Sequence, residues 1–217
     1  MDKTAIGHGE GQGPPRRPAE PQTPDGAVRH VRADARRNID AVREAAKEVF
    51  AVSGVDAPVR EIAVRAGVGV GTIYRHFPQR SDLVVAVFQH AVDACAEAAR
   101  TLAAEHEPGE ALILWLRQYT SFVATKRGLA AALHSGDPAY AALPAYFNQH
   151  LKPALASLLE SAAAAGEVRA GVDPSDLLIA VANLCLPADR SGHPQRMVDL
   201  LIDGLRYGAP ARTTASS

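Results

Sequence analysis

Apolar residues recur at helical spacing in two short runs within residues 58–78, PVREIAVRAGVGVGTIYRHFP. The first run places four of them on one helix face: Val59, Ile62, Ala63 and Ala66. The second run turns Ile73 and Phe77 inward. Between the runs Gly67 tolerates the positive φ of a tight turn, and Pro78 ends the second helix, which we expect over residues 70–77. This spacing predicts a helix-turn-helix.

The outward face of the second predicted helix is rich in groups that suit DNA. It carries Val70, Gly71, Thr72, Tyr74, Arg75 and His76. An α-helix fits the major groove, where arginine pairs with guanine and the methyl groups of Thr and Val contact the thymine methyl. Tyrosine and histidine suit phosphates. The alternative is an amphipathic helix whose polar face meets only water.

The rest of the chain continues the helical pattern. A supporting helix is expected over residues 35–53, ended by Gly54, and a long helix after Pro78 that reaches about residue 105. Further helices are predicted at residues 110–126, 129–134, 138–165 with bends at Pro144 and Pro153, 174–186 and 194–207. Since no strand-like alternation interrupts them, the fold class is all-α.

Composition divides the chain into a tail, a head and a body. The first 28 residues contain ten Gly or Pro and almost no bulky apolar groups, so they cannot form a core. The predicted organisation is a disordered tail at residues 1–30, a DNA-binding head at 31–90, a helical body at 91–210 and a disordered C-terminus at 211–217.

Charge is unevenly distributed although the net charge is only −1. Residues 29–80 hold ten Arg or Lys against six Asp or Glu, whereas residues 81–217 hold ten against fourteen. A basic head on an acidic body is typical of a DNA-binding protein. The arginines Arg29 and Arg32 either reach phosphates or a minor groove or lie in a solvated helix start.

The segment REIAVRAGVGVGTIYRHFPQRSDLVVAVF resembles the N-terminal signature of the TetR family of bacterial transcriptional regulators, with a match from about residue 36 to 90. The resemblance implies a three-helix helix-turn-helix domain followed by a helical ligand-binding and dimerisation domain. It also implies that Tyr74, His76 and Arg80 contact DNA phosphates. The full set of expected DNA contacts is Arg36, Arg37, Arg60, Val70, Gly71, Thr72, Tyr74, Arg75, His76 and Arg80. Gly69 and Gln79 depart from the family pattern because they replace the usual helix caps.

The last two predicted helices have broad apolar faces. By resemblance they pair with their copies in a second chain as a four-helix bundle. The expected interface comprises Leu177, Val181, Leu184, Met197, Leu200, Leu201 and Leu205. Two heads then read half-sites of a palindrome about one helical turn apart. The alternative is that the same residues form a monomeric core.

Aromatic residues gather in the middle of the body and suggest a pocket for a small organic molecule. The candidate lining residues are Trp115, Tyr119, Phe122, Tyr140, Tyr146, Phe147 and His150, with His134 and Asn183 as polar contacts. The alternative is that these aromatics belong to an ordinary core.

The sequence contains no motif that is typical of an enzyme or a metal-binding protein. The chain has no HExxH, serine elbow or phosphate loop, so we expect neither an enzyme nor a metal or cofactor. Cys95 and Cys185 lie far apart in sequence and are expected to be buried. Without an apolar run of about 18 residues, we expect a cytoplasmic protein. The sequence therefore predicts a dimeric regulator, by family habit a repressor released by a ligand, with an architectural DNA-binding factor and, less favoured, an enzyme as alternatives.

Overall fold

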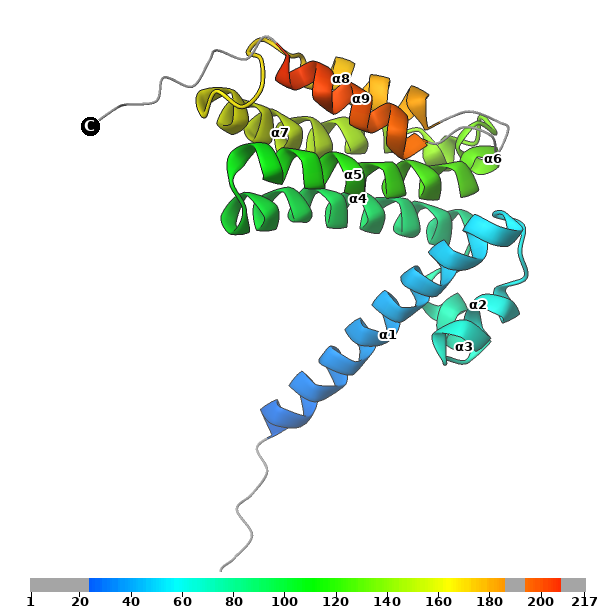
Figure 1. Cartoon of the computed structure of the whole chain (residues 1–217). Helices are drawn as coiled ribbons and strands as arrows, with labels where there is room; N and C mark the ends of the chain where they lie inside the picture. The colour runs from blue at the N-terminus through cyan, green and yellow to red at the C-terminus, as the bar shows by residue number, and fades with distance from the viewer. Residues whose placement is uncertain (1–23, 186–193, 208–217) are drawn as a thin grey trace, which may run out of the picture. The chain divides into compact units, whose positions relative to one another are not determined.

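The computed structural model describes residues 24–185 and 194–207, which form helices joined by turns (Figure 1). The elements are α1 (Pro24–Ser53), α2 (Val59–Ala66), α3 (Val70–His76), α4 (Arg80–Glu105), α5 (Pro108–Gly128), α6 (Ala130–Leu133), the 3-10 helix η1 (Pro138–Tyr140), α7 (Leu143–Ala164), α8 (Pro174–Leu184) and α9 (Pro194–Arg206). The all-α prediction is confirmed. Within these residues no helix is both long and apolar enough to cross a membrane.

Helix α1 begins at Pro24, well before the predicted residue 35, so the expected tail is wrong over residues 24–30. Proline is favoured in the first turn of a helix because its missing N–H would have no partner there. After Gly26 the sequence contains no further Gly or Pro until Gly54, so nothing interrupts the helix. The rest of the expected tail, the C-terminal residues 211–217 and the end of the helix predicted to reach residue 186 lie outside the described residues.

The single helix predicted over residues 138–165 is also wrong, because this segment forms η1 and then α7. The Asp137 carboxylate accepts a hydrogen bond from the Ala139 N–H at 2.9 Å and caps η1. Pro144 lies in the first turn of α7 and helps to start that helix, whereas Pro153 lies inside it. The prolines therefore mark one helix start and one interior position rather than two bends.

The chain forms two compact units, Met1–Arg36 and Arg37–Ser217. The second unit contains the whole helix-turn-helix and the body. In its head, apolar side chains of α1, α2, α3 and α4 are buried in one core: Val42, Ala46, Val49, Phe50, Ile62, Ala63, Ile73, Phe77, Leu83 and Val84. Since each short helix contributes only a few of these residues, α2 and α3 depend on packing for their stability.

In the body, α4, α5 and α7 pack against one another, and α8 and α9 contact α5 (Figure 1). The Trp115 indole N–H donates a hydrogen bond to the Cys95 carbonyl at 2.8 Å and joins α5 to α4. The predicted boundary between head and body at residue 90 falls inside α4, which continues unbroken. Helix α4 therefore belongs to both parts and connects them covalently.

Candidate functional site

The helix-turn-helix has the predicted internal geometry. Gly67 ends α2 with φ 67°, and the Val68 N–H donates to the Ala63 carbonyl at 3.0 Å, which closes the turn. Ile73 of α3 and Phe77, the residue that follows it, are buried. This turn needs a left-handed backbone that glycine adopts without strain, so the angle between α2 and α3 depends on Gly67.

The opposite face of α3 is open. Val70, Gly71, Tyr74, Arg75 and His76 are exposed, and the Thr72 side chain is half-buried. The side chain of Tyr74 is 51% exposed although it is aromatic. The structure therefore brings six of the predicted DNA-contacting residues together on one short helix that is anchored from behind.

The other predicted DNA contacts lie on neighbouring helices. Arg60 is exposed in the first turn of α2, and Arg37 is exposed on α1. Arg36 is also exposed but ends the first compact unit. Arg60 and Arg37 thus add positive charge to the surface of the head.

Arg80 has a structural partner that the sequence did not indicate. Its guanidinium donates a hydrogen bond to the Ala57 carbonyl at 2.6 Å and another to the Val55 carbonyl, both in the loop between α1 and α2. The side chain is half-buried. The two hydrogen bonds of the Arg80 guanidinium therefore join the start of α4 to the loop between α1 and α2. This role is additional to the phosphate contact that the resemblance implies.

The substitutions at the expected caps have different consequences. Gly69 precedes α3 without a side-chain cap. Before α4, however, the Gln79 N–H donates to the Asp82 carboxylate at 2.8 Å. Asp82 thus supplies one hydrogen bond of a capping box, so the start of α4 is better supported than the sequence suggested.

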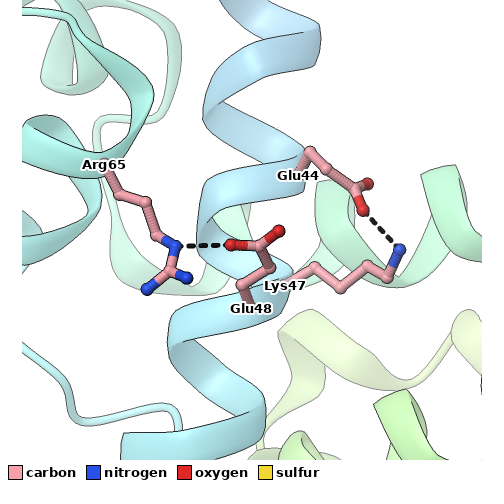
Figure 2. A network of polar contacts seen from close by, with 4 residues as sticks. All are labelled: Glu44, Lys47, Glu48 and Arg65. Carbon is pink, nitrogen blue, oxygen red and sulfur yellow. Dashed lines mark hydrogen bonds and ion pairs between the residues drawn. The ribbon is translucent and has the colours of Figure 1, made fainter.

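Arg65, whose role no motif indicated, forms an ion pair with Glu48 and joins α2 to α1 (Figure 2). Glu44 and Lys47 form a second pair one helical turn earlier on α1. Both pairs are exposed to solvent, so each contributes little to the free energy of unfolding. The Glu48 pair nevertheless holds the Arg65 guanidinium of α2 against α1.

The predicted ligand pocket is not one cavity. Trp115, Tyr119 and Phe122 are buried and stack along α5, with ring centroids 5.5 Å and 5.8 Å apart. The Tyr119 hydroxyl donates to the Leu178 carbonyl at 3.4 Å, and burial raises the pKa of this phenol. These three residues form a core, so the alternative that we considered for them fits the structure better.

The other predicted pocket residues lie at different places in the body and do not form one site. Tyr146 donates a hydrogen bond to the Asp93 carboxylate at 2.6 Å and stacks on His150 with centroids 4.1 Å apart. Burial and the Asp93 carboxylate raise the pKa of Tyr146 to about 12. His150 lines an open groove of about 670 Å³ between α4 and α7, and Asn183 is exposed on α8. These three predicted residues, Tyr146, His150 and Asn183, do not line the second cavity, which contains Phe147 and His134.

Phe147 and His134 line a smaller cavity of about 310 Å³. Its other lining residues come from α4, α5, α6, η1 and α7: Phe88, Lys126, Leu133, Tyr140, Leu143, Pro144 and Asn148. Of these seven, only Tyr140 was among the aromatic residues that the sequence suggested for a pocket, and the other six were not predicted. They are widely separated in sequence and share no motif, so only the packing of the helices brings them together.

The expected dimer residues are divided between core and surface. Leu177, Val181 and Leu205 are buried within the single chain. They belong to its core, so their predicted place in a dimer interface is wrong. Leu184 and Leu201 are half-buried. Met197 and Leu200 are exposed, at 38% and 71%, and Ile179 on α8 is 58% exposed although it was not predicted.

No group of His, Cys, Asp or Glu side chains within residues 24–185 and 194–207 is arranged to hold a metal ion. Cys95 and Cys185 are buried as expected. Burial raises the pKa of the Cys95 thiol to about 12. The thiol of Cys95 therefore behaves as a packed apolar group rather than a nucleophile.

Comparison with known proteins matches two separate parts of the chain to family domains. Residues 42–87 match the domain of bacterial regulatory proteins of the tetR family, and residues 107–207 match the C-terminal domain of SbtR-like transcriptional regulators. An HTH-type transcriptional regulator from Staphylococcus aureus is 39% identical over 64 residues, which are 29% of this chain and 35% of that protein. The chain thus matches only about a third of the length of these curated relatives.

Two solved structures are similar over almost their whole length. The TetR transcriptional regulator SCO0520 from Streptomyces coelicolor is 36% identical with a TM-score of 0.69, covering 77% of this chain and 98% of that one. A TetR transcription regulatory protein from Mycobacterium vanbaalenii is 40% identical with a TM-score of 0.64, covering 81% and 99%. The similarity therefore extends through both head and body.

Proposed function

Because the chain belongs to the TetR family of bacterial transcriptional regulators, we propose that it is a homodimer that represses genes from a palindromic operator until a small organic molecule binds its body. The observation that carries this proposal is the exposed face of α3, with Tyr74 and Arg75 outward and Ile73 buried behind them. A regulator of chromosomal genes acts in the cytoplasm of a bacterium.

In the proposed docking, α3 enters the major groove. Arg75 reads a guanine, while Thr72 and Val70 contact thymine methyl groups. The remaining predicted residues position the head on the DNA backbone: Arg36, Arg37, Arg60, Gly71, Tyr74, His76 and Arg80. Gly71 does so by letting the sugar-phosphate chain approach the helix closely.

The proposed dimer uses the exposed parts of α8 and α9. Ile179, Met197 and Leu200 are large apolar side chains left open on these two helices. Leu184 and Leu201, which are half-buried, complete the surface. Burying such residues against a second copy removes apolar area from water, which supports a four-helix interface.

In the proposed mechanism, the dimer exists in two arrangements that differ in the distance between its two heads. Release from DNA follows when the population shifts to the arrangement that does not fit the operator. A ligand changes this equilibrium only if it binds one arrangement more tightly. Helix α4 starts in the head, where Arg80 contacts Ala57, and continues through the body. A tilt of α4 is therefore the proposed link between ligand and operator.

Selection of random duplex DNA by the purified protein at about physiological salt, followed by sequencing, tests the proposal. A palindrome with half-sites about one turn apart is the expected result. Recovery without any sequence preference would favour an architectural DNA-binding factor instead. Chemical turnover of a bound compound would contradict the assignment as a non-enzyme.

A further inference from the structure

The 310 Å³ cavity between α4, α5, α6, η1 and α7 has the composition of a specific binding site. Most of its walls are apolar: Phe88, Leu133, Leu143, Pro144 and Phe147. Its size is at the lower end of the range of about 300–1,000 Å³ typical of small-molecule sites. The aromatic rings of Phe88 and Phe147 offer flat surfaces, which favour a flat ligand.

The polar groups of this cavity favour negative charge. Lys126 lines it and supplies positive charge, together with the polar side chains of His134, Tyr140 and Asn148, and none of its described lining residues is a carboxylate. The Lys126 ammonium lies 5.7 Å from the centroid of the Phe147 ring. A cation held beside an aromatic ring is suited to a ligand that combines an anionic group with a ring.

His134 is oriented for a second partner. Its Nδ1 lies 2.8 Å from the Ala130 carbonyl oxygen. Since a carbonyl only accepts, Nδ1 carries the proton of this hydrogen bond, and Nε2 of the neutral ring is left to accept a hydrogen bond from a donor group on a ligand. The nearby Asp137 carboxylate is occupied by the Ala139 N–H and does not line the cavity.

We infer that this cavity binds a small aromatic carboxylate, whose ring lies between Phe88 and Phe147 and whose carboxylate faces Lys126. The inference rests on the proposed function, because it names the chemical class of the effector that this function requires. It places the ligand in the part of the predicted pocket that Phe147 and His134 line, beside Lys126, and not in the buried stack of Trp115 and Tyr119.

The position of the cavity links it to the head. Phe88 belongs to α4, and Tyr140 belongs to η1, which packs against α4. Burial raises the pKa of Tyr140, with Asp137 as the next cause, and the charges of Arg80 and Asp56 also act on this phenol. Tyr140 therefore lies within electrostatic reach of the contact that fastens α4 to the head. A ligand that displaces Tyr140 acts where α4 enters the body.

Thermal unfolding of the full chain tests the inference with matched probes. Benzoate and 2-naphthoate at millimolar concentration are compared with benzamide and 2-naphthamide, which have nearly the same shape without the charge. At least one acid should raise the melting temperature, and its amide should have little effect. Equal shifts for acid and amide, or no shift with either acid, would overturn the inference.

Variants locate the binding. Lys126→Met should weaken carboxylate binding about tenfold in titration calorimetry, because it removes the charge and keeps the chain length. Asn148→Asp should weaken it as well by adding a negative charge. Lys152→Met, at an exposed position on α7 outside the cavity, is the matched control and should bind normally. Unchanged binding by Lys126→Met would overturn the assignment.

A failure of this site is distinguishable from a failure of the proposed function. Calorimetry is done without DNA, and selection of random DNA is done without ligand. Specific DNA selection together with absent carboxylate binding would overturn the site alone. Carboxylate binding that depends on Lys126 would support the site even if the protein selected no operator.

Discussion

The guanidinium of Arg80 donates a hydrogen bond to the carbonyl oxygen of Ala57 at 2.6 Å, and its second nitrogen donates to Val55. The first residue of α4 therefore holds the loop that precedes the helix-turn-helix. A hydrogen bond that involves a charged group contributes more than a neutral one. Arg80 thus joins the proposed connecting helix to the head.

Arg80→Ala should lower the free energy of unfolding by about 1.5–3 kcal/mol, measured by urea denaturation. Arg100→Ala is the control, because Arg100 is exposed on the same helix and pairs only with its neighbour Glu97 among the contacts described. Arg80→Lys should keep part of the DNA affinity but lose the paired hydrogen bonds to the carbonyls of Val55 and Ala57. Equal stability of the two alanine variants would contradict the structural role.

Two arginines of the head should differ in their effect on DNA binding. Arg75→Ala should cost about 1–3 kcal/mol at the selected operator and relax preference at one base pair. Arg60→Ala should weaken binding to all sequences and reduce the salt slope by about one. Fluorescence anisotropy over a range of salt measures both. Lys152→Ala in the body should change neither, and a uniform effect of all three variants would refute the proposed docking.

Leu200→Glu should dissociate the proposed dimer, because it places a charge in an apolar interface. We expect the dissociation constant to rise by tenfold or more, about 1.4 kcal/mol, in sedimentation equilibrium. Val52→Glu is the control, since Val52 is 86% exposed on α1. If Leu200→Glu remained as dimeric as Val52→Glu, α9 would not form the interface.

The Cys95 thiol should make stability depend on alkaline pH. Its pKa rises from 9.0 to about 12 through burial. Above pH 9 the unfolded thiol loses its proton while the folded thiol keeps it, so the free energy of unfolding falls as pH rises toward 12. This contribution is fully present below pH 9. Urea unfolding of the wild type and Cys95→Ala on either side of this pH should show a smaller decline for the variant, and parallel declines would contradict the cause.

Gly109→Ala should destabilise the body. The Gly109 N–H donates to the Glu167 carboxylate at 2.5 Å, and an added Cβ would meet that carboxylate. We expect a loss of about 1 kcal/mol in thermal or urea unfolding. Gly71→Ala is the matched control, because an added Cβ has nothing within 4 Å and alanine should stabilise the helix by about 0.5–1 kcal/mol. If both substitutions stabilised the protein, the Glu167 side chain would move away from the added Cβ without lowering the free energy of unfolding.

The local pattern of the chain was enough to predict the head. Helical spacing identified Ile62, Ile73 and Phe77 as its core, and Gly67 as the turn. These features are readable because the interactions that define them lie within one or two helical turns. By contrast, the tail was predicted too long, since composition alone does not locate a helix start such as Pro24.

The sequence by itself determined the helical class, the position of the helix-turn-helix and the outward residues of its second helix. Only the tertiary structure decided that Leu177 and Val181 are buried while Leu200 is exposed, that Arg80 holds Ala57, and that Lys126 shares a cavity with Phe88. An apolar residue at helical spacing shows which face it lies on, but not what covers that face. That depends on contacts between helices distant in sequence, which no local spacing encodes.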